Sequence, residues 1–178
     1  MIDTNDSSTV PTSRAPRRST KPSVATPKRG GLAKGKKRKG VKVDRVFSNA
    51  KTNPYDEKEW DLRTAEITDE GGNVIFKQEN VEVPTDWSQL ATKVVVSKYF
   101  YGEQGTPERE TSVRQLIHRV ARTIADWGVK DGYFTKKDGE IFYDELSWLC
   151  LNQHGAFNSP VWFNVGLHHE YGAGSTLS

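Results

Sequence analysis

The sequence predicts an α+β fold that is mainly helical, with one β-hairpin followed by about three helices. Two short apolar runs flank a Gly-Gly turn at residues 69–73, which is typical of a hairpin. Apolar residues then recur at spacings of three and four along three later segments, which indicates amphipathic helices. All 18 aromatic residues lie after residue 45, so residues 46–178 must build the core.

Residues 1–45 differ from the rest of the chain in charge. They contain 13 of the 26 Lys and Arg residues and three acidic residues, a balance of +10, whereas residues 46–178 contain 13 basic and 20 acidic residues, a balance of −7. Gly, Pro and Ser interrupt the basic runs, and the like charges repel one another. We therefore expect a disordered basic tail over residues 1–45 and a folded unit that begins near Val46.

The basic tail has two interpretations. Clustered Lys and Arg could bind nucleic acid or another polyanion by releasing counterions from phosphates, which would make the chain a nucleic-acid-binding module. The tail has no aromatic residues on which bases could stack. A solvated tail with at most weak polyanion contact is therefore the favoured interpretation.

Localisation follows from what the sequence lacks. No apolar run reaches the roughly 18 residues of a membrane span, and no apolar core follows the amino-terminal charges as in a secretory signal. Cys150 is the only cysteine, so the chain can form neither an internal disulfide nor a cysteine-based metal cage. We expect a cytoplasmic protein without a membrane partner.

The hairpin and a first helix open the folded unit. Apolar residues in 62–67 and 74–76 flank the turn, and residues 79–84 are expected to be extended, because Pro84 disfavours helix at the preceding residue. Thr85 is predicted to cap the helix. Its inward face is predicted to be one stripe at helical spacing, formed by Trp87, Leu90, Ala91, Val94 and Val95.

The second helix has the most regular pattern. Thr106-Pro107-Glu108 offers a cap, a proline at the first helical position and an acidic residue in the first turn, and Gly128 is expected to end the helix. Its inward stripe comprises Val113, Leu116, Ile117, Val120, Ala121, Ile124 and Trp127. The opposite face carries Arg114, His118, Arg119 and Arg122. These side chains could contact phosphate, but a solvated face or a contact with another domain is favoured.

The third helix is predicted from about Phe142 to Gln153, after a turn at residues 136–139. It would bury Leu146, Leu149 and Cys150, and Gly155 would close it. Cys150 has no neighbouring histidine, so we expect a buried, inert thiol.

Few residues form a pattern that carries chemistry. His168 and His169 are adjacent and cannot face the same way on regular structure, so with Glu170 they are expected to be surface residues rather than metal ligands. No nucleophile, base and orienting group come together. We predict no catalytic residue and no metal site in this chain.

The segment after Gly155 is the most informative. A polar turn is followed by an apolar, β-prone run over residues 156–167, which we expect to form a short strand. Such a turn can present a serine hydroxyl to a ligand. Taken alone, the pattern favours an ordinary turn capped by Asn158 and Ser159, with Pro160 fixing the entry to the strand.

The run Phe-Asn-Ser-Pro-Val-Trp-Phe-Asn-Val-Gly at residues 157–166 closely resembles a segment of ribonucleotide reductase large subunits, in the version typical of the cobalamin-dependent class II family. The resemblance extends through residues 83–91, 97–100 and 110–117 and covers roughly 46–167. The combination of these segments makes it specific.

The resemblance implies a radical enzyme, a vitamin B12-dependent ribonucleoside-diphosphate reductase, that replaces the ribose 2′-hydroxyl of a ribonucleotide with hydrogen. In that family adenosylcobalamin supplies the radical, which passes to a cysteine inside a ten-stranded α/β barrel. Residues 46–155 would then be the helical amino-terminal reductase domain, and residues 156–178 the start of the barrel. By the match, Ser159 would contribute to substrate binding, and Asn158 would brace the loop.

The resemblance also implies what this chain lacks. The family's redox and radical cysteines follow the motif, whereas Cys150 precedes it. We therefore expect no turnover without the remaining carboxyl-terminal polypeptide, whether the chain is a truncation or a separately encoded subunit. Trp162 and Phe163 would be covered by barrel strands, and without them we expect an exposed apolar patch or a disordered end.

Overall fold

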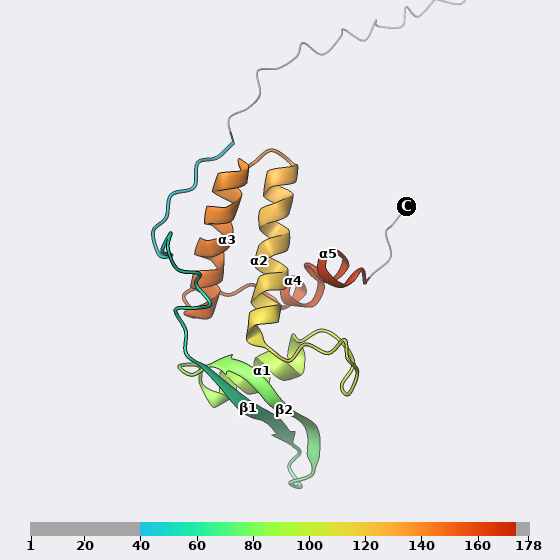
Figure 1. Ribbon diagram of the computed structural model, residues 1–178. Helices are drawn as coiled ribbons and strands as arrows, with labels where there is room; N and C mark the ends of the chain where they lie inside the picture. The colour runs from blue at the N-terminus through green and yellow to red at the C-terminus, as the bar shows by residue number, and fades with distance from the viewer. Residues whose placement is uncertain (1–39, 174–178) are drawn as a thin grey trace, which may run out of the picture. The chain divides into compact units, whose positions relative to one another are not determined.

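The computed structural model describes residues 40–173 and confirms a mainly helical α+β fold with one hairpin (Figure 1). Its elements, in chain order, are β1 (Trp60–Thr68), β2 (Val74–Pro84), α1 (Gln89–Lys98), α2 (Val113–Lys130), α3 (Lys136–Leu151), α4 (Ser159–Asn164) and α5 (Leu167–Tyr171). The tail predicted over residues 1–45 lies mostly outside the described residues.

The segment before β1 lies along α3, as the blue-green trace shows in Figure 1. Val41 N–H donates to the carbonyl of Tyr133 at 2.7 Å, and Arg45 forms an ion pair with Asp144 at 2.6 Å. Contacts with the helices therefore begin a few residues before Val46, the expected start of the folded unit.

The hairpin was predicted correctly. β1 and β2 pair antiparallel, with Trp60 opposite Pro84 and Thr68 opposite Val74. Asp69 holds the turn, because its carboxylate accepts the backbone N–H of Asn73 at 2.8 Å. The buried side chains of Ala65, Val81 and Val83 place one face of the hairpin in the core.

Helix α1 begins later than predicted, and its inward face is different. Ser88, not Thr85, is the N-cap, because Arg63 on β1 binds the carbonyls of Thr85 and Trp87 and holds these residues on the hairpin. Thr92 and Val96 then face the core. The predicted inward residues Leu90 and Val94 are instead 72% and 42% exposed.

Helix α2 also begins later than predicted. Thr111, which precedes it, accepts a hydrogen bond from the backbone N–H of Glu82 on β2, so the chain is still extended at this point. Ser112 caps the helix in a reciprocal capping box with Gln115. The predicted cap at residues 106–108 lies in a loop. The predicted inward stripe is otherwise confirmed through Ala121, but Trp127 is exposed.

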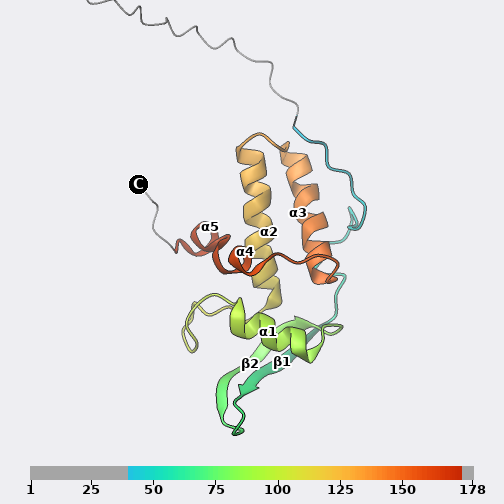
Figure 2. The same ribbon diagram turned by 180° about the vertical axis from the view of Figure 1, so that it is seen from behind.

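Helix α3 begins earlier than predicted and packs antiparallel beside α2 (Figures 1 and 2). Thr135 is its N-cap, so the predicted turn at residues 136–139 is the first turn of the helix. At Gly139 a side-chain carbon would lie 2.4 Å from Val129, so glycine permits the close approach of α2 and α3. Leu151 and Cys150 are buried as this face enters the core, whereas Leu146 and Leu149 are half-buried.

The predicted strand over residues 156–167 is wrong. Residues 159–164 form helix α4, and α5 follows after Gly166. No strand among residues 40–173 lies beside this segment to pair with it. A helix instead satisfies its own backbone, with Val161 N–H bound to the carbonyl of Asn158 at 3.1 Å and Val165 N–H bound to that of Val161 at 2.9 Å.

Candidate functional site

Ser159 lies at the start of α4, where this helix meets the end of α1. Its Oγ atom is 3.1 Å from the phenol oxygen of Tyr99, the residue that caps α1. Ser159 is half-buried, and Tyr99 is its one side-chain hydrogen-bond partner in the described part of the chain. Asn158 is exposed and its side chain does not cap α4. The two predicted site residues therefore stand together at an open edge.

Aromatic side chains surround this edge. Trp162 is 8% exposed and packs edge-to-face with Phe157, with ring centroids 5.3 Å apart, so residues of this chain already cover it. Phe163 is 45% exposed, and its ring lies 5.4 Å from that of Tyr99. The predicted apolar patch is therefore confirmed for Phe163 and wrong for Trp162.

Arg119 on α2 binds the carboxyl end of α4, a contact that the sequence did not predict. It was placed on a solvated basic face, but its side chain is fully buried and pairs with the equally buried Glu110 at 2.9 Å. Its Nη1 atom donates to the carbonyls of Trp162 and Val165, at 3.2 and 2.7 Å. A buried guanidinium must satisfy each N–H group, and the carboxyl end of α4 supplies the acceptors.

The acidic member of the pair is also saturated. Glu110 accepts the backbone N–H of Tyr101 at 2.8 Å and the Tyr171 hydroxyl at 2.8 Å. The rings of Tyr101 and Tyr171 stack with centroids 4.8 Å apart. This network connects the loop before α2 with α5, so both short helices are held against α2.

Gly166 makes this arrangement possible. Its φ is +86°, and an added side-chain carbon would lie 2.5 Å from both the Cγ and the carbonyl oxygen of Arg119. Only glycine combines this backbone conformation with such close packing. The carbonyl of Val165 can therefore reach Arg119.

The other basic residues of α2 are also partnered. Arg114 stacks 4.2 Å above the Trp60 ring, and Arg122 stacks 4.6 Å above the Tyr143 ring. His118 Nδ1 lies 2.7 Å from the Tyr143 hydroxyl. The expectation of a solvated face is thus wrong for Arg119, which is fully buried, whereas Arg114, His118 and Arg122 are half-buried beside their partners, and a contact of this face with another domain stays a prediction.

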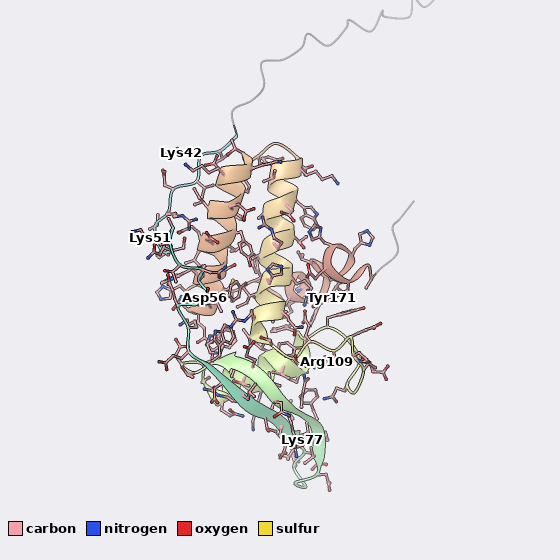
Figure 3. All side chains as sticks on the ribbon, viewed as in Figure 1. Lys42, Lys51, Asp56, Lys77, Arg109 and Tyr171 are labelled. Atoms are coloured by element: carbon pink, nitrogen blue, oxygen red, sulfur yellow. The ribbon has the colours of Figure 1, made fainter. Side chains whose placement is uncertain are left out.

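A cleft of about 480 Å³ opens over this face of α2. Asp56 and Tyr171 line it from opposite sides of the helix, where Figure 3 labels both, and Arg114 and His118 line it from α2. Its charges are of both signs, and its basic side chains already have aromatic or hydroxyl partners. The cleft offers no group that requires a ligand.

A second cleft, of about 370 Å³, lies beside α4 and is mainly apolar. It is bordered by α1 and by the segment after α3, and it is lined by Trp87, Val95, Tyr99, Leu116, Ile117, Cys150, residues 153–157 and Trp162. Tyr99 therefore borders this cleft while it contacts Ser159. Figure 2 shows α1, α4 and the segment between α3 and α4 on the same side of the molecule.

Cys150 is buried, and His168, His169 and Glu170 are exposed, as expected from the sequence. Burial raises the pKa of the Cys150 thiol to about 12, so it is protonated at neutral pH. His169 is exposed and contacts Asp126 at 3.0 Å. Within residues 40–173 no group of His, Cys, Asp and Glu side chains could hold a metal ion, and no helix is long and apolar enough to cross a membrane.

Taken together, these features define a small α+β domain that presents one hydroxyl pair at an open, aromatic edge. A family model described as "Class II vitamin B12-dependent ribonucleotide reductase" matches residues 61–153, from β1 through α3. The chain belongs to this family and corresponds to its amino-terminal region.

Relatives in three bacteria extend this match. A protein of Rhodopirellula baltica named vitamin B12-dependent ribonucleotide reductase is 62% identical over 138 residues, which cover 75% of this chain and 13% of the relative. Proteins of the same name in Streptomyces avermitilis and Bradyrhizobium diazoefficiens are 47% and 36% identical, covering 79% and 74% of this chain. The chain spans about 13–15% of the length of these relatives.

Proposed function

We propose that this chain is the part of a ribonucleotide reductase that contributes Ser159 to the substrate site, and that the remaining polypeptide supplies the radical and redox cysteines. The observation that carries the proposal is the Ser159 hydroxyl, half-buried beside the Tyr99 hydroxyl at an open edge shortly after residues 61–153, the segment that the family model matches. A hydroxyl in this position can still donate to a ligand oxygen, because it has one donor and two acceptor sites.

The surroundings of Ser159 support a binding role rather than a catalytic one. No base lies within hydrogen-bond distance of Ser159 Oγ in the described residues, so the hydroxyl is not activated as a nucleophile. Arg119 holds α4 through two backbone carbonyls, which limits the movement of the turn that carries Ser159. Asn158, exposed beside it, is proposed to brace the loop once the pocket is complete.

The cofactor proposed for the complete enzyme is adenosylcobalamin, which supplies the initiating radical when bound. The described residues do not fit a cobalamin site. Their buried side-chain polar atoms are satisfied within the chain except Arg122 Nε and Thr123 Oγ1, and these two atoms do not form a cluster of ligands. We therefore place the cofactor on the remaining polypeptide, and a cytoplasmic location stays a prediction.

Reconstitution tests this proposal. The chain, the polypeptide that follows the matched region in the Rhodopirellula baltica relative, and a mixture of both would each be incubated with adenosylcobalamin, a dithiol reductant and ribonucleoside di- or triphosphates. We expect deoxyribonucleotide, measured by chromatography, only from the mixture. Full activity of the second polypeptide without this chain would contradict the proposal.

The alternative of a nucleic-acid-binding module rests on the basic tail. Residues 1–39 lie outside the described residues, and the relatives reported above are not named for nucleic-acid binding. The observations therefore favour the reductase.

A further inference from the structure

Helix α1 carries two apolar faces, and the described residues cover one of them. Thr92 and Val96 are buried against the core. Leu90 and Val94, four residues apart and therefore on one side of the helix, are 72% and 42% exposed. A leucine and a valine aligned on the same open side of a helix are unusual for a surface that faces only water.

Another side of α1 borders the candidate site. Val95, next to Val94, lines the apolar cleft of about 370 Å³, and Tyr99 lines the same cleft one helical turn later. The Tyr99 ring then contacts Phe163 of α4. Leu90 and Val94 on one side of α1, Val95 and Tyr99 on the side that borders the cleft, and Phe163 of α4 are here together called the α1 surface, which ends at Ser159.

We propose that the α1 surface docks onto the remaining polypeptide of the reductase. The inference rests on the proposed function and adds the contact face to it. The relatives are about seven times as long as the matched region, so most of their polypeptide lies outside this chain. Any polypeptide that completes a pocket around Ser159 must approach the edge at which the α1 surface ends.

The charges beside the α1 surface further define its partner. Lys93 and Lys98 lie on α1 near Leu90 and Val94. All four side chains line one shallow groove. Basic side chains at the rim of an apolar contact favour acidic side chains on the opposite partner. The partner surface that contacts α1 is therefore inferred to be an apolar patch with acidic side chains at its border.

The test compares two exposed apolar sites of this chain. Leu90→Asp combined with Val94→Asp places charge in the proposed contact, whereas Leu62→Asp places it on β1, at an equally exposed leucine outside the α1 surface. Binding of each variant to the Rhodopirellula baltica polypeptide that follows the matched region would be measured by calorimetry. Circular dichroism and thermal unfolding would establish that each variant folds.

We expect Leu90→Asp with Val94→Asp to weaken this association at least 10-fold, and Leu62→Asp to change it less than 3-fold. Equal effects of both variants, or no association of the wild-type chain, would overturn the inference. Sedimentation of the chain alone provides a further outcome: a dimer that the double variant dissociates would assign the α1 surface to a second copy instead.

The docking result is separable from the proposed function. Ser159→Ala leaves the α1 surface intact, so it should associate like the wild type. If association depends on Leu90 and Val94 but the assembled protein reduces no ribonucleotide, the docking face stands and the proposed function fails.

Discussion

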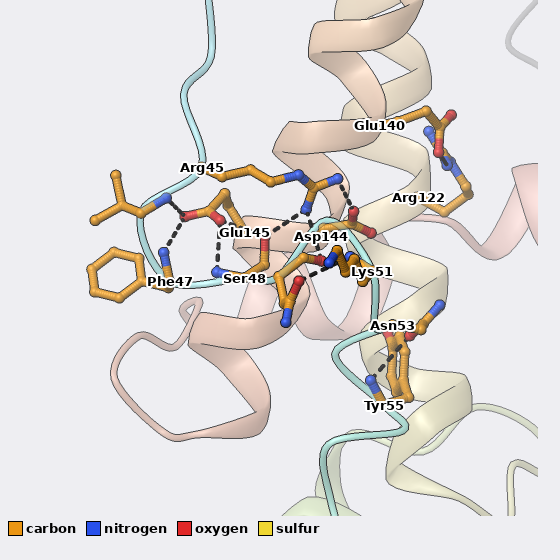
Figure 4. Close-up of polar contacts among 12 residues, drawn as sticks. Arg45, Phe47, Ser48, Lys51, Asn53, Tyr55, Arg122, Glu140, Asp144 and Glu145 are labelled. Atoms are coloured by element: carbon orange, nitrogen blue, oxygen red, sulfur yellow. Dashed lines mark hydrogen bonds and ion pairs between the residues drawn. The ribbon is translucent and has the colours of Figure 1, made fainter.

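Glu145 on α3 binds the segment that precedes the hairpin. Its carboxylate accepts the backbone N–H groups of Val46, Phe47 and Ser48 at 3.1, 3.0 and 2.8 Å, as drawn in Figure 4. Burial by itself would raise the pKa of Glu145, but the hydrogen bonds from the Ser48 hydroxyl and these N–H groups lower it below its ordinary value. The ionised carboxylate is therefore the form that the folded chain prefers.

We predict that Glu145→Gln lowers the free energy of unfolding by about 1–3 kcal/mol at pH 7, because one charged acceptor serves several donors. A lowered pKa contributes stability that is present above the ordinary value of 4.5 and is lost as the pH falls through the folded-state value. Urea unfolding between pH 3 and 7 would show the difference shrinking below about pH 4.5. A difference that stays constant over this range would refute this role of Glu145.

At the scale of elements, α4 and α5 depend on contacts with α2 rather than on their own length. Helices of six and five residues are too short to be stable alone. Arg119 binds the last carbonyls of α4, and Gly166 lets the chain turn directly against it. The position of Ser159 at the start of α4 thus depends on Arg119, a buried residue of α2.

A comparison of two glycines with similar backbone conformations distinguishes the cost of close packing against Arg119 from the cost of a positive φ alone. Gly166 and Gly72 have φ values of +86° and +83°, but an added carbon at Gly72 meets no atom within 4 Å. We predict that Gly72→Ala costs about 1 kcal/mol and that Gly166→Ala costs about 1–3 kcal/mol more, because it also displaces Arg119. Chemical unfolding gives both values, and hydrogen exchange of residues 159–171 locates the second. Equal costs at the two positions would remove Arg119 from this explanation.

Local patterns predicted the elements of this fold better than their ends and faces. The Gly-Gly turn and the stripe from Val113 to Ala121 depend on neighbouring residues, and both were predicted correctly. The start of α1 depends on Arg63, and that of α2 on pairing with Glu82, which are contacts between distant parts of the chain. The β-prone residues of α4 form a helix because no strand of the described chain is available to pair with them.

The candidate site was partly predictable. Asn158 and Ser159 were found from a resemblance carried by adjacent residues, and their roles stay predictions. Tyr99 lies 60 residues earlier, and no local pattern joins it to Ser159. Arg119 was read as solvated because of its charge. Arg119 follows the inward residue Leu116 by three positions, the spacing of neighbours on one helix face, and this was the available signal for burial.

At the scale of the whole molecule, the described residues form a domain with one side whose basic residues have aromatic, hydroxyl or acidic neighbours and one side that exposes apolar residues. The clefted side with Arg114, His118 and Arg122 pairs its charges within the chain. The side with α1 and α4 leaves Leu90 and Phe163 exposed and presents the Ser159 hydroxyl. A region that spans about 13–15% of its relatives would be expected to have such a side, where further polypeptide completes the structure.

A substrate-binding role of Ser159 would be measured most directly as the KM for the ribonucleotide in the protein assembled from this chain and the remaining polypeptide. Ser159→Ala would be compared with Ser97→Ala, the same change at an α1 serine whose hydroxyl donates to the carbonyl of Val94 on the same helix. We predict that KM rises about 10-fold or more for Ser159→Ala, the effect of losing a hydrogen bond to a charged ligand group, and stays unchanged for Ser97→Ala. The same KM for both variants would contradict a substrate-binding role for Ser159.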